Sequence, residues 1–256
     1  GGGGGGSGRR GSGGGGGVGV PGPPETLIAK IFPEWGIGSH PIHDGLSAQS
    51  MRDALEAAAA KGPVKLFYVE TPANPTNALI DFQAMKAELD AFAARHGYRP
   101  ISVCDNTLLG PIFQKPAEHG VDLCVYSLTK YVGGHSDLVA GAVTGSKDLI
   151  KKVRAIRSAF GSQLDPHSCW MLGRSLETLQ IRMERANSNA QLVAEFLKAH
   201  PKVEKIHYLP FNDPASPVGK VFADQCTGAG STFSLFIKGG EAESFAFLDA
   251  LQIAKL

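Results

Sequence analysis

The chain has few cysteines, and none of them form a close pair. Cys104, Cys124, Cys169 and Cys226 are the only four among 256 residues, and no two stand in a C-x-x-C arrangement. This spacing indicates neither a zinc site nor a redox pair. Cys104 and Cys124 lie within apolar, strand-like runs, so we predict that they are buried free thiols. A reducing, cytoplasmic compartment fits this usage best.

An excess of one charge and a long apolar run are also missing. The formal net charge is +1, so no strong electrostatic field favours nucleic acid or an anionic membrane as a partner. No run approaches the ~18 apolar residues of a membrane-spanning helix. No apolar stretch follows Arg9 and Arg10, so residues 1–23 do not resemble a signal peptide. The 43% hydrophobic and 19% charged content is typical of a soluble globular protein.

Residues 1–23 are mostly glycine, with few polar side chains. Such a segment has no apolar surface to offset the entropy lost on ordering, so we predict that it is disordered. An inert linker and an Arg/Gly RNA-binding tail are the alternative interpretations. The globular pattern begins at residue 24. We expect a large domain with a connecting helix over residues 24–200 and a smaller domain over 201–256.

Apolar runs and helical periodicity alternate along the expected large domain. Short strands are predicted at residues 64–69, 101–104, 121–126 and 139–143, and helices at residues 25–32, 47–60, 81–96, 107–119, 148–158 and 165–200. This alternation predicts an α/β fold with a mainly parallel sheet and helices on both faces. Strands at 203–209 and 231–237 and a helix at 241–256 predict a truncated α+β domain that ends before a full sheet could form.

Polar residues follow three of the predicted strands where each strand ends. They are Glu70 and Asn74 after the first, Asp105 and Thr107 after the second, and Ser127, Thr129 and Lys130 after the third. Because parallel strands end at one edge of a sheet, we expect these side chains to form one site. A lysine can form a Schiff base with an aldehyde, hydroxyls can hold a phosphate, and an aspartate can partner a pyridinium nitrogen. The set therefore predicts a site for pyridoxal 5′-phosphate (PLP).

Two of these residues also have simpler interpretations. Lys130 could be a solvated lysine after a strand, since most lysines are exposed. Asp105 could cap the helix that follows it.

His167 could be a metal ligand, but no partner lies at metal spacing, and a polar capping role is favoured.

Residues 67–209 resemble the Cys/Met-metabolism PLP enzymes, which include cystathionine γ-synthase, cystathionine γ-lyase and methionine γ-lyase. The resemblance depends on motifs in a fixed order: residues 70–75 (ETPANP), 105–107 (DNT), 127–131 (SLTKY), 134–137 (GHSD), 176–179 (LETL) and 182–190. It implies the aspartate-aminotransferase fold, type I among PLP-dependent enzymes. It also implies a homotetramer of dimers with shared active sites, and γ-elimination or γ-replacement on sulfur-containing or homoserine-derived amino acids.

The resemblance also assigns roles to individual residues. Lys130 would hold the cofactor and act as the base that removes the α-proton, and Asp105 would partner the pyridinium nitrogen. Ser127 and Thr129 would contact the phosphate, Asn74 would lie near the phenolic oxygen of the ring, and Thr107 belongs to the same cofactor-binding set. No metal is implied.

The chain departs from this family at both ends. Glycines stand where the family has a tyrosine and an arginine that reach a neighbour's phosphate, a phosphate-binding Gly-Met loop and a ring-stacking tyrosine. The family's arginine that grips the substrate carboxylate would lie beyond Leu256. We therefore expect a fragment with weak PLP binding and no turnover, and the alternative function is a catalytically inactive fragment or scaffold.

Overall fold

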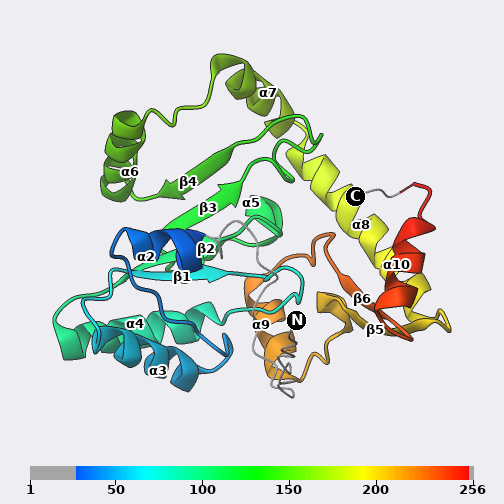
Figure 1. Cartoon of the computed structure of the whole chain (residues 1–256), viewed down its shortest axis with the longest axis horizontal. Coiled ribbons are helices and arrows are strands. Elements are labelled where there is room, and N and C mark those ends of the chain that lie inside the picture. Colours follow the sequence, from blue (N-terminus) through cyan, green and yellow to red (C-terminus); the bar gives the residue numbers. More distant parts are fainter. Residues whose placement is uncertain (1–26, 254–256) are drawn as a thin grey trace, which may run out of the picture.

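The computed structural model describes residues 27–253, so the Gly-rich segment predicted to be disordered lies outside the described residues. A four-stranded sheet has the order β1 (Leu66–Glu70), β2 (Ile101–Asp105), β3 (Leu123–Ser127) and β4 (Gly141–Gly145). The first three strands are parallel and β4 is antiparallel to β3 (Figure 1). The prediction of a mainly parallel sheet is confirmed. The fourth strand begins two residues later than expected and runs backwards, because residues 128–140 contain no helix that could carry the chain back for a parallel pairing.

Two helices cover one face of this sheet. Ser47 and Asp81 cap α3 (Ala48–Ala59) and α4 (Phe82–His96) by accepting backbone N–H groups of the first turn, which matches the predicted helix starts. Their apolar residues pack against the inward side chains of β1 to β3 in one core. The buried members of that core are Met51, Leu55, Phe67, Val69, Phe82, Met85, Leu89, Phe92, Cys104, Val121 and Cys124. Cys104 and Cys124 are thus buried free thiols, as predicted.

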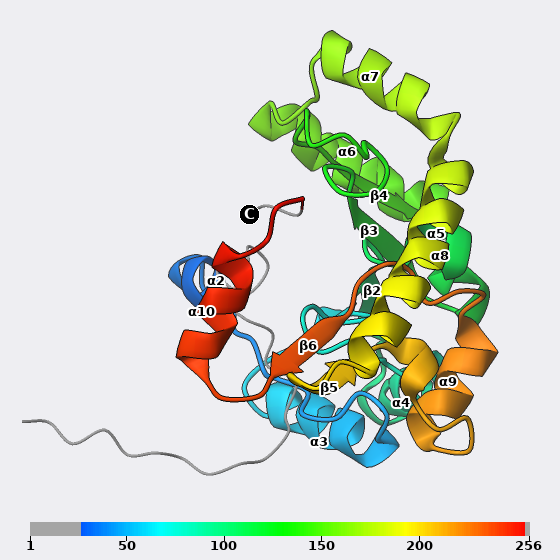
Figure 2. The same cartoon turned by 90° about the vertical axis from the view of Figure 1, so that its right-hand side faces the viewer.

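Two of the predicted helices beyond this core, 107–119 and 165–200, are each divided into shorter pieces, whereas the predicted helix 148–158 is slightly longer. Residues Leu27–Ile31 form one π-helical turn, followed by α2 (Phe32–Glu34). The predicted helix before β3 is two short pieces, α5 (Gly110–Phe113) and the 3-10 helix η2 (Pro116–His119). After β4 come α6 (Lys147–Phe160), α7 (Pro166–Leu176) and the long α8 (Leu179–Lys198), which crosses the molecule toward the C-terminal sheet (Figure 2).

The first turn of α7 corrects one prediction. Asp165 caps this helix by accepting the Ser168 N–H at 2.9 Å, whereas His167 is exposed and stacks on Trp170 with ring centroids 5.9 Å apart. The capping role belongs to Asp165 because its short carboxylate reaches back over the first turn.

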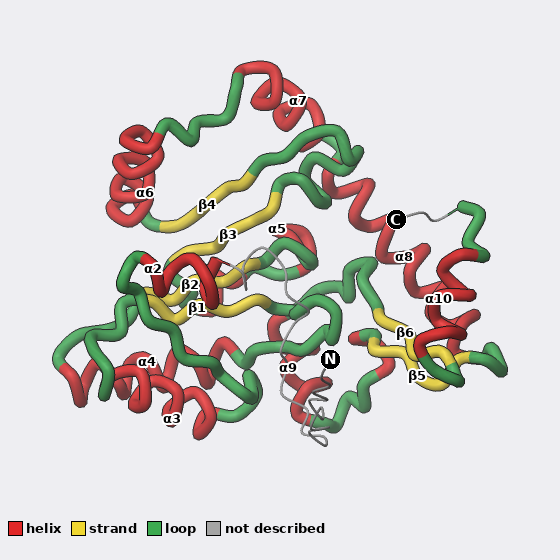
Figure 3. Tube along the Cα trace, viewed as in Figure 1, coloured by secondary structure: helices red, strands yellow, loops and turns green. Residues whose placement is uncertain are grey.

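The C-terminal residues form a second, two-stranded antiparallel sheet (Figure 3). β5 (Val203–His207) pairs with β6 (Ser234–Ile237), and α10 (Glu241–Asp249) contacts β6. The predicted helix to Leu256 ends at Asp249 within the described residues. Two elements were not predicted: the 3-10 helix η3 (Leu209–Phe211) and α9 (Pro217–Gln225). Among residues 27–253, no helix is long and apolar enough to cross a membrane.

Candidate active site

The pleat of the sheet brings the polar strand ends together on the face opposite α3 and α4. Glu70, the last residue of β1, pairs with Asp105, the last residue of β2. Asp105 in turn pairs with Val125 of β3, and Ser127 follows two residues later, so it shares their face. The predicted convergence of these residues at the carboxyl edge of the sheet is therefore present. Each of their side chains is half-buried.

Asp105 is the centre of a hydrogen-bond network. Its Oδ1 accepts the backbone N–H of Thr107 at 3.0 Å and the Thr107 hydroxyl at 2.6 Å. The Thr107 Oγ1 accepts the backbone N–H of Ser127 at 2.8 Å, which joins β2 to the end of β3. The carboxylate thus organises a turn, but it does not cap a helix, because α5 begins only at Gly110 with Leu109 at the N-cap.

Lys130 lies in the turn that follows β3. Its backbone N–H donates to the Ser127 carbonyl at 3.2 Å, and its side chain is exposed. Thr129 is held toward β4: its Oγ1 accepts the Ala140 N–H at 3.1 Å, and its hydroxyl donates to the Ala140 carbonyl at 3.4 Å. The hydroxyl of Thr129 is therefore partly engaged within the protein.

Asn74 stands further from this group. Its backbone N–H donates to the Glu70 Oε1 at 3.3 Å, and its side chain is exposed. Glu70 links it indirectly to Asp105 through the β1–β2 pairing. Burial raises the pKa of the Glu70 carboxyl, the Asn74 N–H opposes this rise, and the nearby Asp105 charge adds to it.

Tyr68 belongs to the site, although the sequence analysis did not single it out. Its hydroxyl donates to Asp105 Oδ2 at 3.3 Å. The signal was present in the sequence, because residues 66–70 alternate and Tyr68 stands two positions before Glu70 on the same face.

Arg182 of α8 is a second residue whose role only the structure reveals. Its guanidinium donates to the carbonyls of Tyr131 at 2.6 Å, Val132 at 3.0 Å and Ser175 at 2.9 Å, and its Nε donates to Thr178 Oγ1 at 3.1 Å. It therefore ties the turn after Lys130 to the junction between α7 and α8. No pattern in the sequence links position 182 to position 131, which is why the contact was missed.

The charges at this edge fit the predicted cofactor. Within residues 27–253, no basic side chain lies within salt-bridge distance of Asp105, and no carboxylate lies within that distance of Lys130. A half-buried carboxylate that has hydroxyl and N–H donors but no cation suits a protonated pyridine nitrogen. An exposed, unpaired amine at the next strand end suits an aldehyde.

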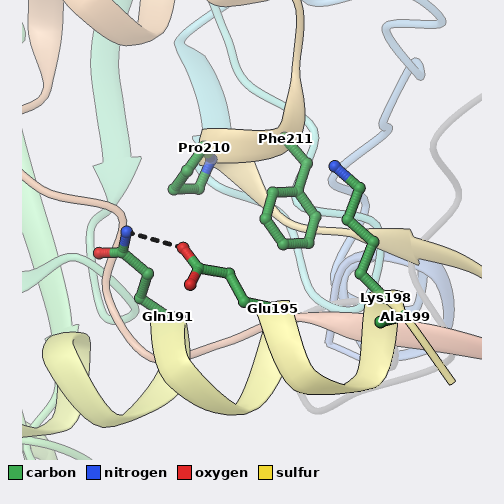
Figure 4. A pocket seen from close by; sticks show the side chains of 6 residues that line it. All are labelled: Gln191, Glu195, Lys198, Ala199, Pro210 and Phe211. Atoms are coloured by element: carbon green, nitrogen blue, oxygen red, sulfur yellow. Dashed lines mark hydrogen bonds between the residues drawn. The ribbon is translucent and has the colours of Figure 1, made fainter.

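A groove of about 440 Å³ lies away from this edge, between α8 and Pro210–Phe211 (Figure 4). It is lined by Gln191, Glu195, Lys198, Ala199, Pro210 and Phe211. None of the predicted site residues lines it, and Lys198 lies over the Phe211 ring at 4.3 Å from its centroid. The groove is thus separate from the candidate active site.

Comparison with known proteins places the chain in a family. The model of the Cys/Met metabolism PLP-dependent enzyme family matches residues 20–256. A cystathionine gamma-lyase of Sus scrofa is 37% identical over 206 residues, which are 80% of this chain and 49% of that protein. An L-methionine gamma-lyase of Brevibacterium sandarakinum is 34% identical over 227 residues, covering 87% of this chain and 55% of that protein. The chain spans about half the length of these curated relatives.

The solved structures agree with the sequence comparison. A crystal structure of metB from Corynebacterium glutamicum superimposes with a TM-score of 0.81 at 29% identity, covering 90% of this chain and 57% of that one. The chain therefore belongs to the Cys/Met-metabolism PLP-dependent enzyme family, and the resemblance noted from the motifs is confirmed. The predicted type I fold is confirmed with it.

Proposed function

We propose that this chain provides part of the cofactor-binding domain of a PLP-dependent enzyme. The enzyme eliminates or replaces a γ-substituent on sulfur-containing or homoserine-derived amino acids. The observation that carries the proposal is the position of Asp105 and Lys130 at the ends of neighbouring parallel strands, in a chain of this family. Its relatives include a cystathionine gamma-lyase and an L-methionine gamma-lyase, which supports this substrate class.

Each predicted site residue receives a role in this proposal. Lys130 would be the amine that holds the cofactor, and it would also be the base that takes the α-proton of the substrate. Asp105 meets the pyridine nitrogen, with Thr107 fixing its Oδ1. Ser127 and Thr129 would supply hydroxyls to the phosphate, and Asn74 would lie near the phenolic oxygen. PLP, when bound, supplies the electron sink that stabilises a carbanion next to the amino group.

The arrangement of the whole protein is part of the same proposal. We place residues 24–200 in the large domain and 201–256 in the small one, and we propose a homo-oligomer in the cytoplasm that acts on a small amino acid. Apolar side chains on the outer faces of α8 and α10 support assembly, since Ile181, Leu192, Phe196 and Phe245 are each more than half exposed.

Chemical trapping tests the assignment of Lys130. The chain is loaded with PLP, reduced with borohydride, digested and analysed by mass spectrometry. We expect the phosphopyridoxyl mass on Lys130, and its loss in Lys130→Ala together with the visible absorbance of the bound cofactor. Lys115→Ala is the matched control, because Lys115 is also exposed and, within residues 27–253, forms a salt bridge only with Glu118, at 3.3 Å. Equal labelling of Lys115, Lys147 and Lys130 would reject the assignment.

A further inference from the structure

Tyr68 and Asp105 are diagonal neighbours on adjacent strands. Tyr68 of β1 pairs with Val103 of β2, and Asp105 stands two residues further along β2 on the same face. A phenol is long enough to span such a diagonal in a sheet. Its hydroxyl donates to Asp105 Oδ2 at 3.3 Å, and the ring is half-buried beside it.

The two oxygens of Asp105 have different partners. Thr107 supplies both donors on Oδ1, its backbone N–H and its hydroxyl. Among the described residues, Tyr68 is the only side chain that donates to Oδ2. Removing Tyr68 would leave the carboxylate held at one oxygen and free to rotate about it.

The hydroxyl of Tyr68 remains a donor at any pH at which the enzyme would operate. Burial raises the pKa of the phenol, and the charge and hydrogen bond of Asp105 raise it further. The phenol therefore keeps its proton and points it toward the carboxylate.

We propose that Tyr68 is a positioning residue that holds the Asp105 carboxylate in place for the pyridine nitrogen of PLP. This inference rests on the proposed function. Tyr68 acts through Asp105 and makes no contact of its own with the reacting atoms. Its effect should therefore appear in cofactor binding and should depend on the presence of the aspartate.

The test measures the dissociation constant of PLP by absorbance titration of the 256-residue chain. Tyr68→Phe keeps the ring and removes the hydroxyl. We expect PLP to bind about fivefold to tenfold more weakly, as for the loss of one long hydrogen bond to a charged acceptor. Tyr98→Phe is the matched control, because the Tyr98 hydroxyl accepts the Val64 N–H at 3.0 Å at the opposite end of β1. That variant should bind PLP as the unaltered chain does.

A double-mutant cycle with Asp105→Asn identifies the route of the effect. If Tyr68 acts through the carboxylate, Tyr68→Phe should weaken binding by less than twofold in the Asp105→Asn background. Far-UV circular dichroism and thermal unfolding of every variant establish that each is folded. A Tyr68→Phe chain that binds PLP as tightly as Tyr98→Phe, or one that loses the same factor with and without Asp105, overturns the positioning role alone. Failure of the unaltered chain to bind PLP would instead overturn the proposed function, and this inference with it.

Discussion

Replacing Gly134 with alanine should lower the free energy of unfolding by about 3–4 kcal/mol, because two independent penalties meet at this residue. Gly134 has φ of +78°, a left-handed conformation that costs an alanine about 1 kcal/mol or more. A methyl group there would also lie 2.6 Å from the Cζ of Arg182 and overlap its Nη1. The guanidinium would have to move.

Movement of Arg182 breaks hydrogen bonds that hold the turn after Lys130. Its two bonds to the carbonyls of Tyr131 and Val132 are 2.6 and 3.0 Å long. Losing both costs about 2–3 kcal/mol, since each net contribution is about 1–1.5 kcal/mol. The arginine is long and flexible, but its fixed partners on α7 and α8 limit where it can go.

Urea unfolding followed by circular dichroism measures the effect, with unchanged m-values required for the comparison. Gly161→Ala is the matched control: Gly161 has φ of +72°, and a methyl group there would meet no atom within 4 Å. It should cost only about 1 kcal/mol. In an Arg182→Ala background, the loss of unfolding free energy caused by Gly134→Ala should also fall to about 1 kcal/mol. Equal losses of unfolding free energy for Gly134→Ala and Gly161→Ala would refute the clash. A loss of about 3–4 kcal/mol for Gly134→Ala in the absence of the Arg182 side chain would show that Arg182 is not the residue displaced.

Two further predictions concern the core under the sheet. Glu88 is buried and accepts two hydrogen bonds from Arg52, at 2.7 and 3.0 Å, which hold its pKa below the ordinary value. The pKa of Glu88 is lowered on folding, so this pair stabilises the fold at neutral pH and its contribution is lost progressively as pH falls from the ordinary value of 4.5 through the lowered pKa. Glu88→Gln should therefore cost about 1–2 kcal/mol at pH 7 and progressively less on acidification in urea titrations, and a pH-independent difference would contradict this. Phe92→Ala should lower the free energy of unfolding by about 3–5 kcal/mol in the same assay, because Phe92 is fully buried. Phe160 is 79% exposed, so Phe160→Ala should change it by less than about 0.5 kcal/mol. Similar values for both variants would contradict the assigned core.

The sequence predicts most of the central sheet because its signals are local. The apolar runs before Glu70, Asp105 and Ser127 end where polar residues begin, and the observed strands end at those same residues. Helix starts were equally readable at Ser47 and Asp81, whose side chains accept first-turn N–H groups. Such elements are determined within a few residues, so no tertiary contact has to be known in advance.

The parts that could not be predicted depend on contacts between distant segments. Helix α9 begins at Pro217 after the N-cap Ser216, an ordinary helix start. Its sequence is short and interrupted by glycine, so packing against the rest of the chain decides whether the helix forms. Arg182 contacts Tyr131, which is 51 positions earlier in the chain, and no sequence periodicity indicates such a pair. Arg182 also donates to the Ser175 carbonyl and the Thr178 hydroxyl at the junction between α7 and α8.

The register of β1 against β2 decides whether the candidate site exists at all. Phe67 and Val69 must face α3 and α4 to be buried, and Cys104 must do the same on β2. Since directly paired residues in a sheet share a face, Val69 has to pair with a residue on the same face as Cys104, and it pairs with Cys104 itself. This pairing leaves Tyr68 and Asp105 together on the opposite face, whereas a slip of one residue would put either the aspartate or the apolar set on the wrong side. The buried core under the sheet therefore brings the Tyr68 hydroxyl to the Asp105 carboxylate, and changes that loosen that core should weaken cofactor binding even where they touch no site residue.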